Sequence, residues 1–185
     1  MNVEKDISSF DVREDDIWIS SFPKCGTTWT QEMVWNIVNN VDLEQARSVT
    51  LDKRIPFLEL TGLYDQRRLD SLNDGIFKNT LSISNVKKIN FLEEKLGKPE
   101  WYNSVDFVKN LPTSVPRLIK THLCYEMLPH QVKEKKPKLI YVTRNPRDTV
   151  VSFFNHWKVL EGYEGDIEIM VKWHVQQSKF YIRIF

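Results

Sequence analysis

The chain has 185 residues, of which 41% are hydrophobic, so it has enough apolar material to fill the core of one domain. Its 26 basic residues nearly cancel its 25 acidic ones, and a net charge of +1 creates no long-range field for nucleic acid or an acidic membrane surface. No run approaches the roughly 18 apolar residues of a membrane span, and the start lacks a secretory-signal pattern. We therefore expect a single cytoplasmic domain over residues 1–185, with no nucleic-acid or membrane partner.

The first predicted unit is a strand, a loop and a helix. The apolar run 17–19 follows a charged segment, which is typical of a buried strand, and the polar segment SFPKCGTT follows it as a loop. Apolar residues then recur at steps of three and four, which predicts a helix. Its expected apolar stripe consists of Trp29, Met33, Val34, Ile37, Val38 and Val41.

Two later runs, 117–120 and 138–142, have the composition of strands buried on both faces, and we expect them to be neighbours in a parallel sheet. After the second run, Asn145 can cap a helix, Pro146 suits its first position and Asp148 complements the helix dipole. The pattern predicts an α/β fold, with a central parallel sheet flanked by helices. The apolar face of the helix after Asn145 is expected to consist of Val150, Val151, Phe154 and Trp157.

Between residues 43 and 116 the pattern indicates helices and loops, with helical pieces around 85–96 and 104–110 and no strand. A last helix is expected to start near Asp166. Its shared face consists of Ile167, Met170, Val171, His174 and Val175.

The loop before the first helix is a candidate anion site, because backbone N–H groups and a helix N-terminus converge there. Gly26 allows close approach of a phosphate, Thr27 and Thr28 add hydroxyl donors, Lys24 adds a mobile charge, and Trp29 offers a flat face for a base. The alternative is an ordinary turn with a surface lysine and a core tryptophan. The loop is not a Walker A motif, in which the lysine follows the glycine, so a standard nucleoside triphosphatase is disfavoured.

A second candidate anion site lies at the third strand. Arg144 stands at the end of this strand, and Ser152 lies eight residues later on the following helix. A guanidinium and a hydroxyl suit recognition of a phosphate dianion. The alternative is a salt-bridge arginine at the sheet edge and a serine on the helix surface.

Three segments, SFPKCGTTW, KTHL and YVTRNPRDTVVSFFNHW, resemble in this order the motifs of the cytosolic sulfotransferases. The segments QEMVWNIV, IPFLEL, PRLIKTHL and MLPHQVKEKKPKLIYV also resemble that family, so the similarity runs from about Asp11 to His156. The resemblance implies a P-loop-like strand-loop-helix that binds the 5'-phosphosulfate of 3'-phosphoadenosine 5'-phosphosulfate (PAPS).

The resemblance also implies roles for single residues. The phosphosulfate would be held by Lys24, Cys25, Gly26, Thr27, Thr28 and Trp29, the last against the adenine. Arg144 and Ser152 would hold the 3'-phosphate. In KTHL, His122 would act as the base on the acceptor hydroxyl, while Lys120 would steady the transferring group.

The chemistry of sulfuryl transfer requires these residue types. Negative charge develops on the bridging oxygen of the donor, so an ammonium such as that of Lys24 helps most in the transition state. An imidazole is suited to removing the proton of an alcohol at neutral pH. His122 follows a strand end, where ligands of α/β sheets gather, and Lys120 lies on the same strand face. The other histidines, which lack such a context, are expected to be structural or surface residues: His130, His156 and His174.

We therefore expect a sulfotransferase that moves a sulfuryl group from PAPS to a hydroxyl of a small acceptor, such as a phenol, an alcohol or a steroid-like compound, without a metal. The acceptor pocket should be apolar, although a core role is open for each candidate. These candidates are Phe22, Phe57, Phe77 and Tyr64. Two alternatives remain: a truncated nucleotide-binding or regulatory relative, and a nucleotide kinase.

The chain also departs from the family pattern. Cys25 replaces a serine and Cys124 replaces a proline, and neither lies in a metal-ligand spacing, so we expect reduced thiols. The glycine-rich RKG-type motif and the usual C-terminal dimerisation segment are missing. We expect a domain that is incomplete at the C-terminus and shortened at the N-terminus, and a homodimer remains possible.

Overall fold

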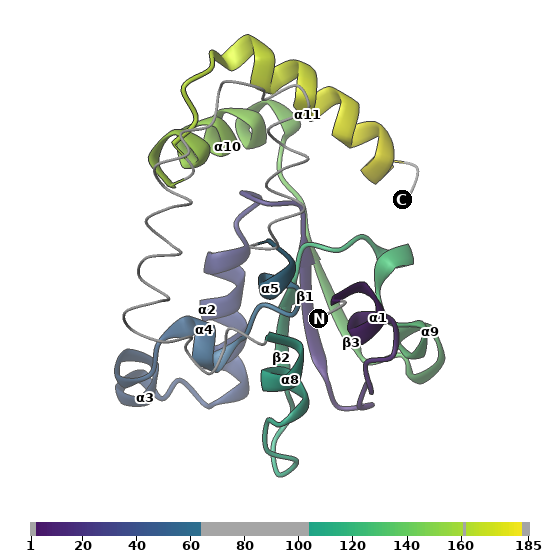
Figure 1. Ribbon diagram of the computed structural model, residues 1–185. Coiled ribbons are helices and arrows are strands. Elements are labelled where there is room, and N and C mark those ends of the chain that lie inside the picture. The colour runs from purple at the N-terminus through teal and green to yellow at the C-terminus, as the bar shows by residue number, and fades with distance from the viewer. Residues whose placement is uncertain (1–2, 64–103, 161, 183–185) are drawn as a thin grey trace, which may run out of the picture. The chain divides into compact units, whose positions relative to one another are not determined.

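The computed structural model describes residues 3–63, 104–160 and 162–182 of the chain (Figure 1). The chain divides into two compact units, the first formed by Met1–Gly62 and Glu100–Thr143 and the second by Leu63–Pro99 and Arg144–Phe185. The single domain expected over residues 1–185 stays a prediction.

The first unit contains a parallel sheet of three strands, β1 (Ile17–Ser21), β2 (Leu118–Thr121) and β3 (Lys138–Val142), which confirms the predicted α/β fold. The strand order is β2-β1-β3 (Figure 1), so the expectation that 117–120 and 138–142 are neighbours is wrong. Strand composition identifies buried strands but carries no information on which of them pair. The expected burial on both faces holds for β1 and most of β2, whereas β3 is largely exposed.

Alternation along β1 and β2 sends side chains into two apolar clusters. Ile17, Ile19 and Leu118 pack with Trp35 and Ile55 in one cluster. The other cluster includes Phe10, Trp18, Leu58, Val108, Ile119 and Val132. Both faces of the two strands are therefore covered, which fixes their register.

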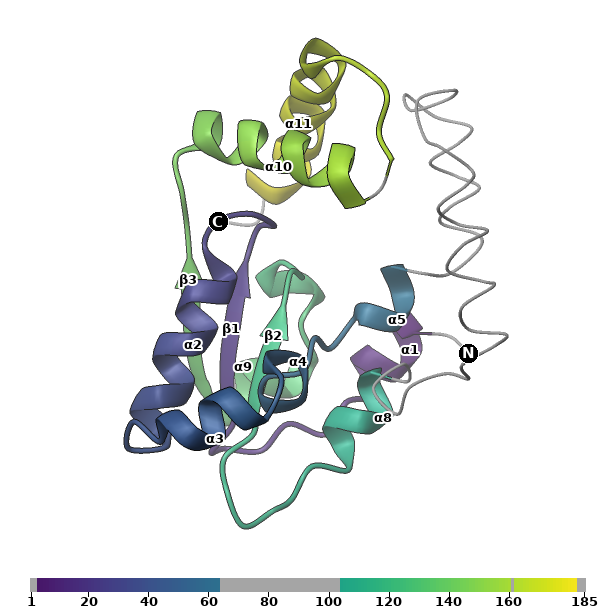
Figure 2. The ribbon, with the colours of Figure 1, turned by 90° about the vertical axis from the view of Figure 1, so that its left-hand side faces the viewer.

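Helices of the first unit lie on both sides of this sheet (Figure 2). The predicted helix at 104–110 is confirmed, and the piece expected around 85–96 lies outside the described residues. The helical elements are α1 (Val3–Ser8), α2 (Thr27–Val38), α3 (Leu43–Ser48), α4 (Leu51–Arg54), α5 (Leu60–Leu63), α8 (Ser104–Lys109), the 3-10 helix η2 (Tyr125–Met127) and α9 (His130–Lys135).

The first predicted helix forms as α2, but its buried face differs from the predicted stripe. Val34 and Val38 pack against the core as expected, together with buried Trp35 and Gln31. Gln31 is buried because its side-chain amide donates to the Ile55 carbonyl oxygen at 3.2 Å. The other members of the stripe are exposed by more than half: Trp29, Met33, Ile37 and Val41.

The second unit contains α10 (Pro146–Leu160) and α11 (Ile167–Ile182), which confirms both predicted helices. The Asn145 carboxamide oxygen accepts the Arg147 backbone N–H at 3.0 Å, as a cap requires. On α10, Phe153 is buried and stacks on Trp173 with ring centroids 5.5 Å apart, whereas Val151, expected on the apolar face, is exposed. On α11, Met170 and His174 are buried, but the other expected face residues are partly exposed: Ile167, Val171 and Val175.

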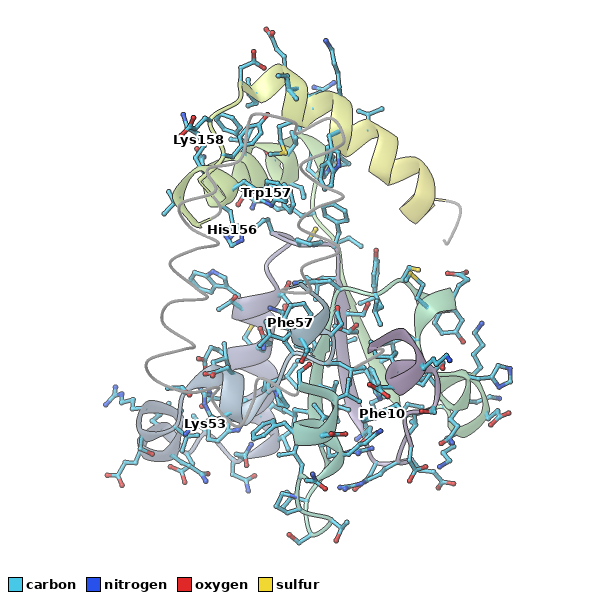
Figure 3. All side chains as sticks on the ribbon, in the orientation of Figure 1. Phe10, Lys53, Phe57, His156, Trp157 and Lys158 are labelled. Atoms are coloured by element: carbon cyan, nitrogen blue, oxygen red, sulfur yellow. The ribbon has the colours of Figure 1, made fainter. Side chains whose placement is uncertain are left out.

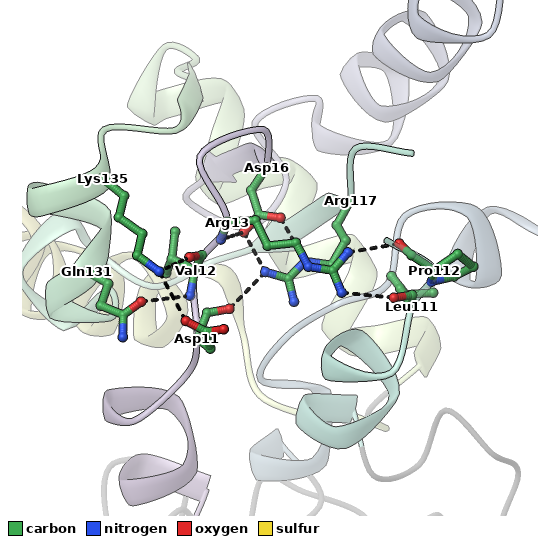
Figure 4. A network of polar contacts seen from close by, with 9 residues as sticks. All are labelled: Asp11, Val12, Arg13, Asp16, Leu111, Pro112, Arg117, Gln131 and Lys135. Atoms are coloured by element: carbon green, nitrogen blue, oxygen red, sulfur yellow. Dashed lines mark hydrogen bonds and ion pairs between the residues drawn. The ribbon is translucent and has the colours of Figure 1, made fainter. Parts of the chain in front are cut away.

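An ion pair fixes the start of the sheet (Figure 4). The Arg117 guanidinium donates to both carboxylate oxygens of Asp16 at 2.7 Å, and the side chains are only 2% and 0% exposed. Arg117 also donates to the Asp11 carbonyl oxygen and lies over the ring of Phe10. The pair thus joins the segment before β1 to the start of β2.

Candidate active site

The loop between β1 and α2 has the geometry of an anion-binding turn. Lys24 and Gly26 have φ angles of 69° and 103°, so two of three consecutive residues adopt left-handed backbone. A side chain at Gly26 would be strained at this angle, and the space next to its Cα is open. Gly26 also begins α2, because its carbonyl oxygen accepts the Thr30 N–H. The first N–H groups of α2 lack intrahelical partners, as in every helix, and are available at this loop.

The side chains of the loop differ in exposure. Thr28 and Trp29 are exposed, while Lys24 and Cys25 are half-buried. Thr27 is buried, and its hydroxyl shares a hydrogen bond of 2.6 Å with the hydroxyl of Ser21.

His122 follows β2 and lies next to the end of β1. Its Nδ1 lies 2.8 Å from the carbonyl oxygen of Ser21 and 3.3 Å from the hydroxyl of the same residue. A carbonyl oxygen can only accept, so the neutral ring carries its proton on Nδ1 and its lone pair on Nε2. This tautomer presents Nε2 as a base.

Lys120 and Phe57 lie beside the imidazole. The rings of Phe57 and His122 form a T-shaped pair with centroids 5.0 Å apart, and the Lys120 ammonium lies 4.2 Å from the centroid of the Phe57 ring. Figure 3 labels Phe57, which forms a parallel bridge with Lys120 near the carboxyl end of β2. Burial lowers the pKa of Lys120, the positive charge of Lys24 lowers it further, and the charge of Glu59 opposes both. The structure therefore brings Lys24, Lys120 and His122 to one end of the sheet.

Glu59 is a site residue that the sequence analysis missed. It is 8% exposed, and its carboxylate accepts the backbone N–H of His122 and, at 3.0 Å, the hydroxyl of Thr121. Burial raises the pKa of Glu59 to about 7, although both hydrogen bonds and the Lys120 charge lower it. The signal was the segment IPFLEL, which the family resemblance included. The segment around Glu59 pairs with β2 through one isolated bridge, between Phe57 and Lys120. One bridge produces no alternation of apolar and polar residues, so the sequence pattern could not place Glu59 beside β2.

The raised pKa of Glu59 predicts a pH-dependent stability. Below pH 4.5 the carboxyl of Glu59 is protonated in both the folded and the unfolded chain. Between pH 4.5 and about 7 it keeps the proton only in the folded chain. The free energy of unfolding should therefore fall by about 3 kcal/mol over this range and not above it. Urea unfolding of the wild type and Glu59→Gln at several pH values measures the difference. A constant difference between the two proteins would contradict the assignment.

Some of the remaining predicted residues belong to the second unit, and others lie outside the described residues. Arg144, which is exposed, and Ser152, which is half-buried on α10, belong to the second unit, so a shared site with Lys24 stays a prediction. Phe22 is half-buried in the loop, and Phe77 and Tyr64 lie outside the described residues. His130 is exposed and pairs with Glu134 at 3.0 Å. Burial lowers the pKa of His174. Among the described residues, no group of three or more metal-ligating side chains occurs, and no helix is long and apolar enough to cross a membrane.

The first unit has a parallel sheet whose central strand leads through a glycine turn into a helix, with a histidine at the end of the neighbouring strand β2. This arrangement defines an α/β protein. The family model described as "Sulfotransferase domain" matches residues 14–182. The chain belongs to the sulfotransferase family, which confirms the resemblance found in the sequence.

Similar proteins include "Luciferin sulfotransferase" of Photinus pyralis, which is 37% identical over 91% of the chain and 40% of its own length. "Sulfotransferase 1E1" of Homo sapiens is 31% identical over 85% of the chain and 40% of its own length. The chain thus spans about 40% of the length of these curated relatives.

Two solved structures share the fold. Retinol dehydratase in a complex with retinol and PAP matches with a TM-score of 0.67 and 27% identity, over 90% of this chain and 47% of that one. A mouse sulfotransferase complexed with PAP matches with a TM-score of 0.54 and 28% identity, over 92% of this chain and 44% of that one.

Proposed function

We propose that the chain carries the phosphosulfate loop and the catalytic base of a sulfotransferase that uses PAPS to sulfate a hydroxyl of a small molecule, in the cytoplasm. The observation that carries the proposal is the arrangement of His122, whose Nδ1–H is directed to the Ser21 carbonyl oxygen while Lys120 and Lys24 lie nearby. Family membership and the PAP named in two similar structures support the same donor class.

The proposed reaction transfers a sulfuryl group between two oxygens. PAPS supplies an activated S–O bond to a phosphate. His122 Nε2 takes the proton of the acceptor hydroxyl, and the hydroxyl oxygen forms a bond to the sulfur of PAPS. At the same time the bond between this sulfur and the bridging phosphate oxygen breaks, and the electron pair of the broken bond stays on the phosphate oxygen. The Lys24 ammonium stabilises that oxygen, and Lys120 holds an oxygen of the group in transfer.

The rest of the donor would be held by the residues predicted from the sequence. The backbone and hydroxyls of Cys25, Gly26, Thr27 and Thr28 would bind the phosphosulfate in a P-loop-like manner, with Trp29 against the adenine. Arg144 and Ser152 would bind the 3'-phosphate. Phe57, which lies beside both Lys120 and His122, is the described aromatic residue that best fits the acceptor side of the site. The acceptor class stays a small phenol, alcohol or steroid-like compound.

Lys24→Met should slow sulfuryl transfer by about 100- to 1,000-fold, because it removes the charge that stabilises the leaving oxygen. It should also weaken PAP binding by about tenfold, as expected for loss of one charged hydrogen bond. Transfer of labelled sulfate to a panel of phenols and alcohols measures the first effect, and calorimetry with PAP measures the second.

Lys53→Met is the matched control, because Lys53 is exposed on α4 and receives no role in the site (Figure 3). It should leave both values unchanged. An equal effect of the two substitutions would overturn the role of Lys24, and PAP binding without any transfer by the wild type would favour a nucleotide-binding relative over an enzyme.

A further inference from the structure

Backbone hydrogen bonds place Glu59 beside the residues that follow β2. The Lys120 N–H donates to the Pro56 carbonyl oxygen at 2.9 Å, and the Leu58 N–H donates to the Lys120 carbonyl oxygen at 3.0 Å. This parallel bridge pairs Phe57 with Lys120, so two residues further along Glu59 lies level with His122. The position of the carboxyl is therefore set by the backbone of the sheet edge.

The segment that carries Glu59 is also held from the other side. The Ser104 hydroxyl donates to the Leu58 carbonyl oxygen at 2.7 Å, and the Ser104 backbone N–H donates to the Thr61 hydroxyl at 3.0 Å. These bonds fix the segment to α8 without involving the carboxyl of Glu59. They offer a way to disturb the segment while leaving the contacts of Glu59 intact.

The carboxylate of Glu59 holds the turn from which His122 projects. One oxygen accepts the His122 backbone N–H and the other accepts the Thr121 hydroxyl. The Thr121 oxygen itself accepts the Leu123 N–H at 3.0 Å, so its own proton is directed to Glu59. The acceptor capacity of Glu59 thus fixes three consecutive residues, Thr121, His122 and Leu123.

The imidazole is fixed at two points, since its backbone is held by Glu59 and its Nδ1 by the Ser21 carbonyl oxygen. Building on the proposed function, we propose that Glu59 is a positioning residue for the transfer: its carboxylate holds the backbone of His122 so that Nε2 is aimed at the acceptor hydroxyl.

This role requires a carboxylate. A glutamine has one acceptor and one donor group, so it can accept from either the His122 N–H or the Thr121 hydroxyl but not from both through two oxygens. Glu59→Gln has nearly the shape of the wild-type side chain and therefore separates hydrogen bonding and charge from packing.

The test compares four variants in the full chain. Glu59→Gln should lower kcat by about 10- to 100-fold with little change in KM, because a misaligned base affects the chemical step. Thr121→Val should also lower kcat, and Thr121→Ser, which keeps the hydroxyl, should have the wild-type rate. Ser104→Ala should leave kcat unchanged.

A second readout does not depend on activity. Nitrogen-15 NMR of His122 in the free chain should report the Nδ1–H tautomer in the wild type and a larger fraction of the Nε2–H tautomer in Glu59→Gln and Thr121→Val. If the wild type transfers no sulfate but the tautomer still changes in Glu59→Gln and Thr121→Val, the positioning role is supported while the proposed function fails.

Normal kcat and an unchanged tautomer in folded Glu59→Gln would overturn the inference. Equal losses of kcat in Glu59→Gln and Ser104→Ala would also overturn it, because Ser104 holds the backbone of the same segment but does not contact Thr121 or His122 through the Glu59 carboxylate. If Glu59→Gln does not fold, a rate in Thr121→Val equal to that in Thr121→Ser overturns it instead.

Discussion

Asp16→Ala should lower the free energy of unfolding by about 3–5 kcal/mol, because it leaves the guanidinium of Arg117 buried without a carboxylate. Both side chains are nearly inaccessible, and Asp16 accepts two hydrogen bonds from Arg117 at 2.7 Å and a third from the Arg13 N–H at 2.8 Å. The substitution should therefore release the segment before β1 from β2. Chemical denaturation at neutral pH measures the loss.

Asp11→Ala is the matched control, drawn in the same network (Figure 4). The Asp11 carboxylate pairs with Lys135 at 3.1 Å but is 79% exposed, so its loss should cost less than about 1 kcal/mol. The Asp11 carbonyl oxygen, which accepts from Arg117, remains in this variant. Equal free energies of unfolding of the two variants would show that the buried pair of Asp16 and Arg117 stabilises the fold no more than the exposed pair of Asp11 and Lys135.

His122→Ala should reduce kcat for sulfuryl transfer by about 100- to 10,000-fold, the range typical of a lost general base. The Ser21 carbonyl oxygen fixes the ring proton of His122 on Nδ1, so Nε2 is the ring nitrogen that can take the proton of the substrate hydroxyl. PAP binding should change little, because the base acts on the acceptor. Single-turnover transfer and calorimetry on the same preparation separate the two effects.

His130→Ala provides the comparison for His122. His130 is exposed at the start of α9 and contacts Glu134, so its removal should leave kcat unchanged. A loss of transfer in both variants, or in neither, would contradict the assignment of His122 as the base.

Local chemistry allowed much of the fold to be predicted. The runs at 17–19, 117–120 and 138–142 form strands, the loop at Gly26 leads into a helix, and Asn145 caps α10. These features depend on residues close in sequence, such as a glycine with positive φ or an asparagine that accepts an N–H two residues later. The polar loop after the first strand indicated Lys24, and the family resemblance of KTHL implied the roles of Lys120 and His122. The place of His122 just past a strand end agrees with where ligands gather in α/β proteins.

The features that were missed depend on tertiary contacts. Gln31 is buried on α2 because the Ile55 carbonyl oxygen lies opposite it, and no helical period indicates such a partner. The central place of β1 requires knowledge of which strands pair. Glu59 reaches the site through one bridge to β2, 63 residues away from His122 in the chain.

The contact between His122 and Ser21 has a consequence for mutational scanning. The group that selects the tautomer is a peptide oxygen, which every amino acid at position 21 supplies. Replacing the Ser21 side chain removes only its hydroxyl contacts with Thr27 and His122 and leaves this acceptor in place. A substitution library, or a table of residue frequencies, reports on the side chain at position 21 and would therefore not reveal that the backbone of this residue directs the proton of His122.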